Sequence, residues 1–469
     1  MTHRIGFDSM SLAPYLPLYL PKGPQYRCPG EQYDISYSVH LARISSGYPL
    51  CRNCPHKTET GELSADLLTW LNRSEESKPQ RSLFTPEGVR GIYLNELNRK
   101  VVGELAAAFA RLLWERNPPH VKPRTTPENS AEGSEQPHTS PSTPLVLVGH
   151  DERPHSPDLL TGVVQVLRRM SCRVLDASTV PLPWFERVIS EQQTAAAIYI
   201  GASGHAPAWS GLNFWIDRAV PCTAEHLLPE ISTRFETGVQ RPSRNSSGYS
   251  SIHTTPRYED RLRHLFHALR PLKIVVGCAS RMGGEILRRL LASTACELID
   301  RELPRKKSDW SSPTDPDRKA IVTLIRENNA HLGCLIGEDL QTFLCFDETG
   351  EPVPWSAIGL FAVEELLIEH PHLKVVLSER IAPTLETPLR QRGVETAQVP
   401  SSRAAVVRSM HDLDAKLGID SDRIWFDDTG ATADGLMLLG NILQAMSRSD
   451  MDLSNLAGKI LASNRPLRG

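Results

Sequence analysis

The sequence lacks any run of about 18 uninterrupted apolar residues, which a membrane-spanning helix would need. Its first ten residues, MTHRIGFDSM, also lack the basic stretch and continuous apolar core of a secretory signal. The sequence also lacks an excess of charge of either sign, because 52 Lys and Arg nearly balance 55 Asp and Glu, for a formal charge of −3. We therefore expect no membrane partner and no nucleic-acid partner.

Cysteine is scarce, with nine residues spread over 469 positions. An odd, thinly distributed set argues against a disulfide framework and favours a reducing compartment, so we expect a cytoplasmic protein. The composition, 40% hydrophobic and 23% charged, is that of folded globular proteins and excludes wholesale disorder. The length exceeds that of one ordinary domain, so several domains are expected.

Composition divides the chain into segments. Residues 1–82 are rich in Pro, Tyr, Ser and Cys without a long helical period, which predicts an irregular, cysteine-containing N-terminal extension. Residues 117–144 contain seven prolines among polar residues, which is typical of a disordered insertion. A second polar stretch, 237–256, marks the expected boundary between domains.

Between these stretches the pattern alternates between strands and helices. A helical period predicts a helix from an N-cap at Asn95 to Arg116, where Asn117-Pro118-Pro119 ends it. Further strands are predicted at 145–148, 173–175, 195–200, 273–276, 332–336, 343–346, 374–377, 395–399 and 423–426, with helices at 285–291, 318–327 and 432–446. This order predicts an α/β fold of three consecutive domains with mixed or parallel sheets, at 83–236, 257–352 and 353–469.

Several motifs follow one another in the order of a known family. Residues 84–91, FTPEGVRG, are similar to FGTDGVRG, and residues 149–156, GHDERPHS, to GRDTRxSS. Residues 174–183, with VLD and VPLP, are similar to VxDxG…PTP. Over about residues 83–460 the sequence thus resembles the phosphohexomutases, the superfamily of phosphoglucomutases, phosphomannomutases and phosphoglucosamine mutases. The resemblance implies three phosphohexomutase-like domains and intramolecular phosphotransfer on hexose phosphates in carbohydrate metabolism.

The segment Gly201–Pro207, GASGHAP, stands where this family has the phosphoserine loop TASHNP. A serine at a glycine-rich strand end can carry a phosphoryl group, and a neighbouring histidine can act on the phosphate or the sugar. The resemblance makes Ser203 the phosphoryl carrier, with His205 and Arg90 as catalytic partners and Arg153 as a phosphate or loop partner. The alternative is a Gly/Ala-rich turn after a buried strand, without chemistry.

The segment 337–342, GEDLQT, aligns with the family's metal loop DGDADR. Of the three aspartates that bind Mg²⁺ in the family, only Asp339 remains, because Gly337 and Gln341 replace the others. Asp339 with Glu338 as a second ligand is the magnesium site that the resemblance implies. A tight acidic turn between two buried strands is the alternative.

The segment 418–423, GIDSDR, stands in place of the sugar-recognition motif GExSGH, so Ile419 and Arg423 replace a glutamate and a histidine. Ser421 and Arg423 are the substrate- or phosphate-binding residues that remain, and a surface loop is the alternative. The family's fourth domain, which anchors the distal phosphate, is expected to be absent. Two hypotheses follow: a phosphohexomutase with impaired activity, or a non-catalytic phosphosugar-binding or scaffolding protein. Neither predicts an oligomeric state.

One cluster lies outside the resemblance. Cys51 and Cys54 form a CxxC pair, with His56 just after it and Cys28 upstream. Two thiolates at this spacing can chelate one ion, and Cys28 with His56 would complete a tetrahedral zinc site. An iron–sulfur cluster and free thiols in a loose tail are the alternatives.

Overall fold

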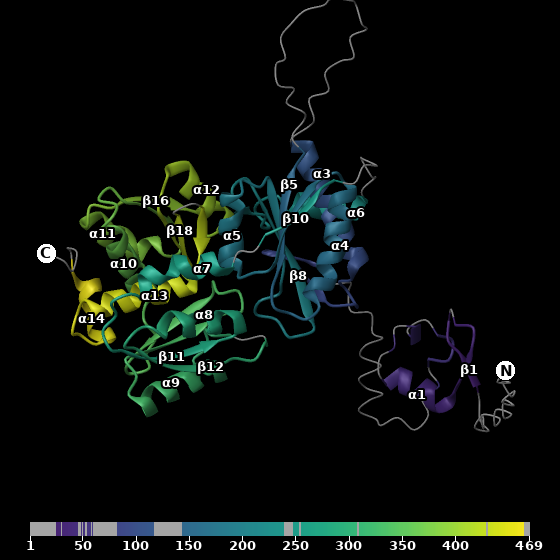
Figure 1. The fold of residues 1–469 in the computed structure, drawn as a ribbon, viewed down its shortest axis with the longest axis horizontal. Coiled ribbons are helices and arrows are strands. Elements are labelled where there is room, and N and C mark those ends of the chain that lie inside the picture. Colours follow the sequence, from purple (N-terminus) through teal and green to yellow (C-terminus); the bar gives the residue numbers. More distant parts are fainter. Residues whose placement is uncertain are drawn as a thin grey trace, which may run out of the picture. The chain divides into compact units, whose positions relative to one another are not determined.

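The computed structural model describes residues 25–29, 31–45, 48, 50–51, 54–57, 59, 82–116, 143–238, 247–252, 255–306, 309–427 and 430–463. The chain divides into two compact units, Met1–Ser82 and Leu83–Gly469 (Figure 1). The predicted disordered insertion, 117–144, lies outside the described residues except for its last two positions. Of the predicted boundary at 237–256, residues 239–246 and 253–254 also lie outside them.

The first unit contains more regular structure than its composition predicts. Strand β1 (Gln25–Arg27) pairs antiparallel with β2 (Asp34–Ser36), and helix α1 (Tyr37–Ser45) follows directly. The expectation of an irregular extension is therefore wrong for these residues. Three-residue strands and a nine-residue helix are too short to show a clear period in the sequence.

The second unit begins with an eight-stranded mixed sheet in the order β10-β6-β5-β7-β8-β4-β3, with β9 paired to β8. The strands are β3 (Phe84–Thr85), β4 (Gly88–Ile92), β5 (Leu145–His150), β6 (Arg173–Thr179), β7 (Ala196–Ile200), β8 (Trp209–Ile216), β9 (Val220–Pro221) and β10 (Tyr249–Ser251). The helices are α3 (Arg99–Arg116), α4 (Ser156–Arg169), α5 (Leu182–Glu191) and α6 (Leu228–Thr237). Helix α5 covers one face of the sheet, and α3, α4 and α6 lie on the other (Figure 1). Because β10 pairs with β6, this sheet extends beyond the expected boundary at 236.

Helix α3 starts later than predicted. The side-chain oxygen of Asn98 accepts hydrogen bonds from the backbone N–H groups of Lys100 (3.0 Å) and Val101 (3.1 Å). Asn98 therefore caps the helix, and the assignment of the cap to Asn95 is wrong. The predicted end at Arg116 is confirmed.

Two smaller mixed sheets follow. The first has the order β12-β11-β13-β14 and the second β16-β15-β17-β18-β19, and in each an antiparallel strand joins a parallel core. The strands are β11 (Lys273–Cys278), β12 (Glu297–Glu302), β13 (Leu332–Ile336), β14 (Phe343–Asp347), β15 (Lys374–Ser378), β16 (Glu395–Val399), β17 (Leu417–Ile419), β18 (Ile424–Asp427) and β19 (Ala431–Ala433). The helices are α7 (Thr255–Leu262), the 3₁₀ helix η2 (Arg263–Phe266), α8 (Arg281–Leu291), α9 (Pro316–Asn328), α10 (Trp355–Leu366), α11 (Ala382–Gln391), α12 (Arg403–Leu413), α13 (Gly435–Ser447) and α14 (Leu453–Ala462).

Three successive mixed sheets with covering helices confirm the predicted α/β class. One continuous hydrophobic core runs from α5 through β11 and β13 to β15, α10 and α13, so the strand ends that carry the loops are held together. In the described part of the chain, no helix combines the length and apolarity needed to cross a bilayer.

Candidate functional site

Loops from all three sheets of the second unit line one cleft of about 590 Å³. This volume lies within the range of roughly 300–1,000 Å³ that is usual for small-molecule sites. The lining residues come from the β3–β4 turn, the loop after β7, the β13–β14 turn and the ends of β15, β16 and β17. They include Glu87, Arg90, Ser203, His205, Glu338, Asp339, Gln341, Arg380, Arg403, Asp422 and Arg423.

Ser203 lies in this cleft on the loop that leaves the buried strand β7. The next residue, Gly204, has a φ of +73°, a conformation that side chains disfavour, so glycine is required for the turn. The Ser203 hydroxyl oxygen accepts a hydrogen bond of 3.2 Å from the backbone N–H of Asp339. The Nδ1 atom of His205 lies 3.0 Å from the carbonyl oxygen of Ser203, so His205 folds back on its own loop.

Arg153 lies beneath the Ser203 loop, and its side chain is 0% exposed. Its guanidinium donates to the carbonyl oxygens of Ala202 (2.8 Å), His205 (3.0 Å), Ala206 (2.8 Å) and Trp209 (3.1 Å). One side chain thus donates to four carbonyls of this loop. Of the two roles predicted for Arg153, these contacts are those of a loop partner, and contact with a phosphate stays a prediction.

The charge of Arg153 is balanced by two buried carboxylates. Its guanidinium lies 3.2 Å from Asp151 and 2.6 Å from Glu338. Arg305 also contacts Glu338, at 2.8 Å. Burial raises the pKa of Glu338 to about 7, although the arginine beside it lowers the value. Glu338 is therefore tied to two guanidiniums at the junction of the first and second sheets.

Arg90, Arg380 and Arg423 also line the cleft, and none of them is in direct contact with a carboxylate among the described residues, although Glu87 and Asp151 act electrostatically on Arg90. Arg90 instead donates to the carbonyl of Val89 and to the side-chain oxygen of Asn213, each at 2.8 Å, and its burial lowers its pKa to about 10. Guanidiniums that line a cleft without a carboxylate partner favour binding of an anion. Sequence reasoning missed Arg380, whose position directly after β15 was the available signal.

Arg403, also missed by sequence reasoning, is already paired. It contacts Glu87 at 2.8 Å and the buried Glu186 at 3.4 Å. Burial raises the pKa of Glu186 to about 7, against the opposing effect of Arg403. Arg403 therefore links α12 to the first domain, and its positive charge balances the carboxylates of Glu87 and Glu186.

In the segment predicted to recognise sugar, Ser421 is hydrogen-bonded within its own loop, whereas Arg423 lines the cleft. The backbone N–H of Ser421 donates to Asp420 (2.7 Å), which also accepts the hydroxyl of Ser378 (2.5 Å). Ile419 belongs to β17 and is fully buried, so it packs in the core. Of this segment, Asp420, Asp422 and Arg423 line the cleft.

Comparisons with known proteins show which families this chain is similar to. The family model for phosphoglucomutase/phosphomannomutase, alpha/beta/alpha domain I, matches residues 134–241, which include Arg153 and the Ser203 loop. A phosphomannomutase/phosphoglucomutase of Pseudomonas aeruginosa is 22% identical over 321 residues, covering 66% of this chain and 67% of the relative. A phosphoglucosamine mutase of Parafrankia sp. is 23% identical over 396 residues, covering 80% of this chain and 82% of the relative. The family model and these relatives support the phosphohexomutase superfamily for this chain.

Solved structures show the same fold. A phosphoglucomutase/phosphomannomutase family protein from Burkholderia thailandensis superposes with a TM-score of 0.64 at 17% identity, over 80% of this chain and 79% of that one. A Thermus thermophilus protein assigned as a phosphomannomutase gives a TM-score of 0.61 at 16% identity, over 81% of this chain and 83% of that one. The predicted phosphohexomutase-like architecture is confirmed.

Phosphohexomutases typically use Mg²⁺, so the metal loop can be tested against that ion. One carboxylate oxygen of Asp339 accepts the N–H groups of Gln341 (3.0 Å) and Thr342 (2.9 Å), and the other accepts the Thr342 hydroxyl (3.0 Å). The Gln341 side chain donates to Glu186 at 2.7 Å. Since Glu338 is held by two arginines, every acidic group of the loop is occupied by protein donors.

Magnesium requires several oxygen ligands in near-octahedral geometry. Across the described ranges, no group of three or more His, Cys, Asp or Glu side chains is arranged to hold an ion. The residues of the β13–β14 turn therefore do not fit the family's metal. What they form instead is a hydrogen-bonded acidic turn, the alternative that the sequence left open.

The residues predicted to bind zinc lie in the first unit: Cys28, Cys51, Cys54 and His56. Cys28 and Cys54 are buried, and Arg43 donates to the Cys28 sulfur at 2.9 Å. Burial raises the pKa of the Cys51 thiol, and the charges of Cys28 and Cys54 raise it further. Among the described residues, these side chains are not arranged as a group that could hold an ion. His56 instead pairs with Glu59 at 2.8 Å. The zinc site stays a prediction.

Proposed function

We propose that this phosphohexomutase binds hexose phosphates in the cleft beside Ser203 and that its phosphoryl transfer is strongly impaired. The relatives named phosphomannomutase and phosphoglucosamine mutase support the substrate class. Arg90, Arg380 and Arg423 support it independently, because three guanidiniums without carboxylate partners suit a phosphate group.

The retained residues have separate roles in this proposal. Ser203, at the end of β7, is the group that would accept a phosphoryl group, and His205 is the titratable side chain nearest to it along the loop. Arg90 and Arg423 hold the phosphate of the sugar. Arg153 acts from below as a positioning residue, because it fixes the carbonyls of the loop that carries Ser203.

The observation that carries the impairment is the state of the β13–β14 turn. In the family a bound magnesium ion stabilises the charge that develops during phosphoryl transfer. Here Asp339 caps its own turn and Glu338 neutralises Arg153, so neither carboxylate is available. Losing such electrostatic stabilisation typically costs about 10²–10³-fold in rate for each contact.

The experiment is interconversion of the 1- and 6-phosphates of glucose and mannose, with Mg²⁺ and a hexose bisphosphate activator present. We expect a rate far below the roughly 1–10³ s⁻¹ that is usual for enzymes. Calorimetry with glucose 6-phosphate should nevertheless show binding. A rate near 10 s⁻¹ that disappears in Ser203→Ala would contradict the impairment.

The second hypothesis is a non-catalytic phosphosugar-binding or scaffolding protein, in which the same cleft binds its ligand and no phosphoryl transfer occurs. It is favoured by the absence of free carboxylates in the turn, and it predicts binding of glucose 6-phosphate with no turnover that depends on Ser203. Phosphate analysis of Ser203 by peptide mass mapping separates the two hypotheses, because only an active or residually active protein acquires the phosphoserine.

A further inference from the structure

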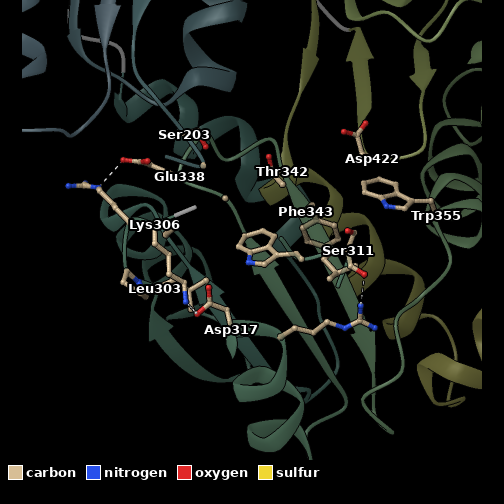
Figure 2. A pocket seen from close by; sticks show the side chains of 18 of the residues that line it. Ser203, Leu303, Lys306, Ser311, Asp317, Glu338, Thr342, Phe343, Trp355 and Asp422 are labelled. Atoms are coloured by element: carbon tan, nitrogen blue, oxygen red, sulfur yellow. Dashed lines mark hydrogen bonds and ion pairs between the residues drawn. The ribbon is translucent and has the colours of Figure 1, made fainter. Parts of the chain in front are cut away.

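A second cavity of about 500 Å³ opens from the same cleft. The two share Ser203, Gly204, Glu338, Thr342 and Asp422, so a ligand bound beside Ser203 can extend from one into the other. Ser203 and Glu338 lie on one side of this second cavity, and Trp355 and Asp422 lie on the opposite side (Figure 2). We refer to it as the aromatic lobe.

The walls of the aromatic lobe are mainly apolar. Three aromatic side chains line it, from three different segments: Trp310 from the loop before α9, Phe343 from the start of β14, and Trp355 from the start of α10. Leu303 and Leu344 add aliphatic surface. Aromatic rings spaced around one cavity favour a flat, apolar group that can stack on them.

Two of the cations on the wall are paired with carboxylates, whereas Arg318 and Asp422 also line the lobe and have no ion pair among the described residues. Lys306 pairs with Asp317 at 3.0 Å, and Arg305 pairs with Glu338 at 2.8 Å. Polar groups are therefore confined to part of the wall. A second sugar ring carries more hydroxyl groups than a nucleobase has polar atoms, and it would lose more hydrogen bonds to water against the aromatic surfaces.

The size of the lobe also favours a nucleoside over a small substituent. A small N-acyl substituent on a hexose, with two carbons and an oxygen, would leave most of the 500 Å³ empty. Arg90, Arg380 and Arg423, the three unpaired arginines, lie in the adjoining cleft, where they suit a diphosphate as well as a single phosphate. A hexose 1-phosphate that is extended through a second phosphate to a nucleoside has each of these parts.

We propose that the phosphosugar ligand of this protein is a nucleoside diphosphate hexose, whose base stacks on Trp310, Phe343 and Trp355 in the aromatic lobe. The hexose and both phosphates occupy the cleft beside Ser203. The inference rests on the proposed function, because it takes the cleft to bind a phosphosugar.

The test is calorimetric titration of the full chain with UDP-glucose, GDP-mannose and glucose 1-phosphate. We expect at least one of the two nucleotide sugars to bind 10-fold or more tightly than glucose 1-phosphate. Trp310→Leu and Trp355→Leu should weaken that binding by about 5- to 150-fold, the range for loss of one base–aromatic stack. Their affinity for glucose 1-phosphate should change less than 2-fold, which also reports that the variants fold.

The matched control is Trp114→Leu, which removes an indole on α3 that donates to the carbonyl of Met170 outside the lobe. It should leave all three affinities unchanged. Nucleotide sugars that bind no more tightly than glucose 1-phosphate, or tryptophan variants that weaken all ligands equally, would overturn the inference. Binding of a nucleotide sugar without any binding of glucose 1-phosphate or glucose 6-phosphate would instead refute the proposed function.

Discussion

Replacing Arg153 with methionine should destabilise the protein more than any other single change in the cleft. The side chain is fully buried and satisfies the carbonyls of Ala202, His205, Ala206 and Trp209. Methionine fills similar space but donates no hydrogen bond. The substitution therefore removes four hydrogen bonds to this loop, although backbone N–H groups still donate to the carbonyls of Ala202 and Ala206. It also removes the positive charge from between two buried carboxylates.

The expected loss can be estimated from these contacts. Breaking a buried ion pair by removing one partner costs about 3–5 kcal/mol. Hydrogen bonds to a charged group contribute about 1.5–3 kcal/mol each, and several are lost together. Because Glu338 can take up a proton when Arg153 is gone, part of the electrostatic cost is relieved. We expect the free energy of unfolding to fall by at least about 4 kcal/mol.

The measurement is urea unfolding followed by circular dichroism, with Arg305→Met as the matched control. Arg305 also pairs with Glu338, but its side chain is 26% exposed, so its loss should cost less than about 1.5 kcal/mol. Arg153→Lys should recover only part of the loss, because an ammonium cannot span four carbonyls as a guanidinium does. A loss below about 1 kcal/mol in Arg153→Met, or one equal to that of the control, would refute the argument.

Two further predictions concern other parts of the chain. Burial raises the pKa of Asp434 to about 7, whereas the unfolded chain releases this proton near 3.8. As the pH rises from 3.8 to 7, the free energy of unfolding should therefore fall by about 1.4 kcal/mol per pH unit. Asp434→Asn keeps the cap of α13 and should abolish this component, which urea midpoints at pH 5 and 7 will show; equal pH dependence in both proteins would contradict it. In the first unit, elemental analysis should find about one zinc per chain, lost in Cys28→Ser; wild-type protein without a bound transition metal would exclude the site.

The sequence predicted several strands of the parallel cores well, because they are short and bounded by polar turns. The apolar Leu332–Ile336 and the more polar Glu395–Val399 were both placed at their observed limits. The strands that were missed are those whose pairing depends on tertiary contacts. Trp209–Ile216 and Glu297–Glu302 carry polar residues and are held in register by their neighbours in the sheet, which no local pattern records.

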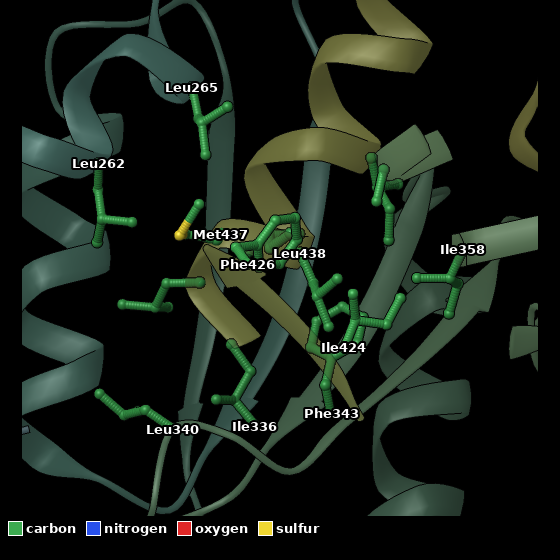
Figure 3. Close-up of a cluster of buried hydrophobic side chains, with 14 of the residues drawn as sticks. Leu262, Leu265, Ile336, Leu340, Phe343, Ile358, Ile424, Phe426, Met437 and Leu438 are labelled. Carbon is green, nitrogen blue, oxygen red and sulfur yellow. The ribbon is translucent and has the colours of Figure 1, made fainter. Parts of the chain in front are cut away.

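The candidate site was predicted only in part, and for a similar reason. Ser203, Arg90 and Arg423 were found because they lie in or replace motif positions, and the cleft does bring them together. Arg380 and Arg403 were missed because each lies on a loop or helix start far away in sequence. Their position in the cleft follows from the shared core of the second and third sheets, in which Ile336 and Phe343 lie beside Ile424 and Phe426 (Figure 3).

In the segment 337–342, one substitution accompanies a change in the partners of the neighbouring side chains. In the motif a glycine stands where this chain has Glu338, and that glycine has no side chain to offer the buried Arg153. Here the added carboxylate reaches Arg153 at 2.6 Å, while Gln341 turns toward Glu186 and Asp339 closes onto its own turn. The charge balance that a metal ion would supply is therefore provided by guanidinium groups. Since protein cations stay in place while a bound ion exchanges, a cleft of this kind should hold its ligand equally well with Mg²⁺ or with a chelator present.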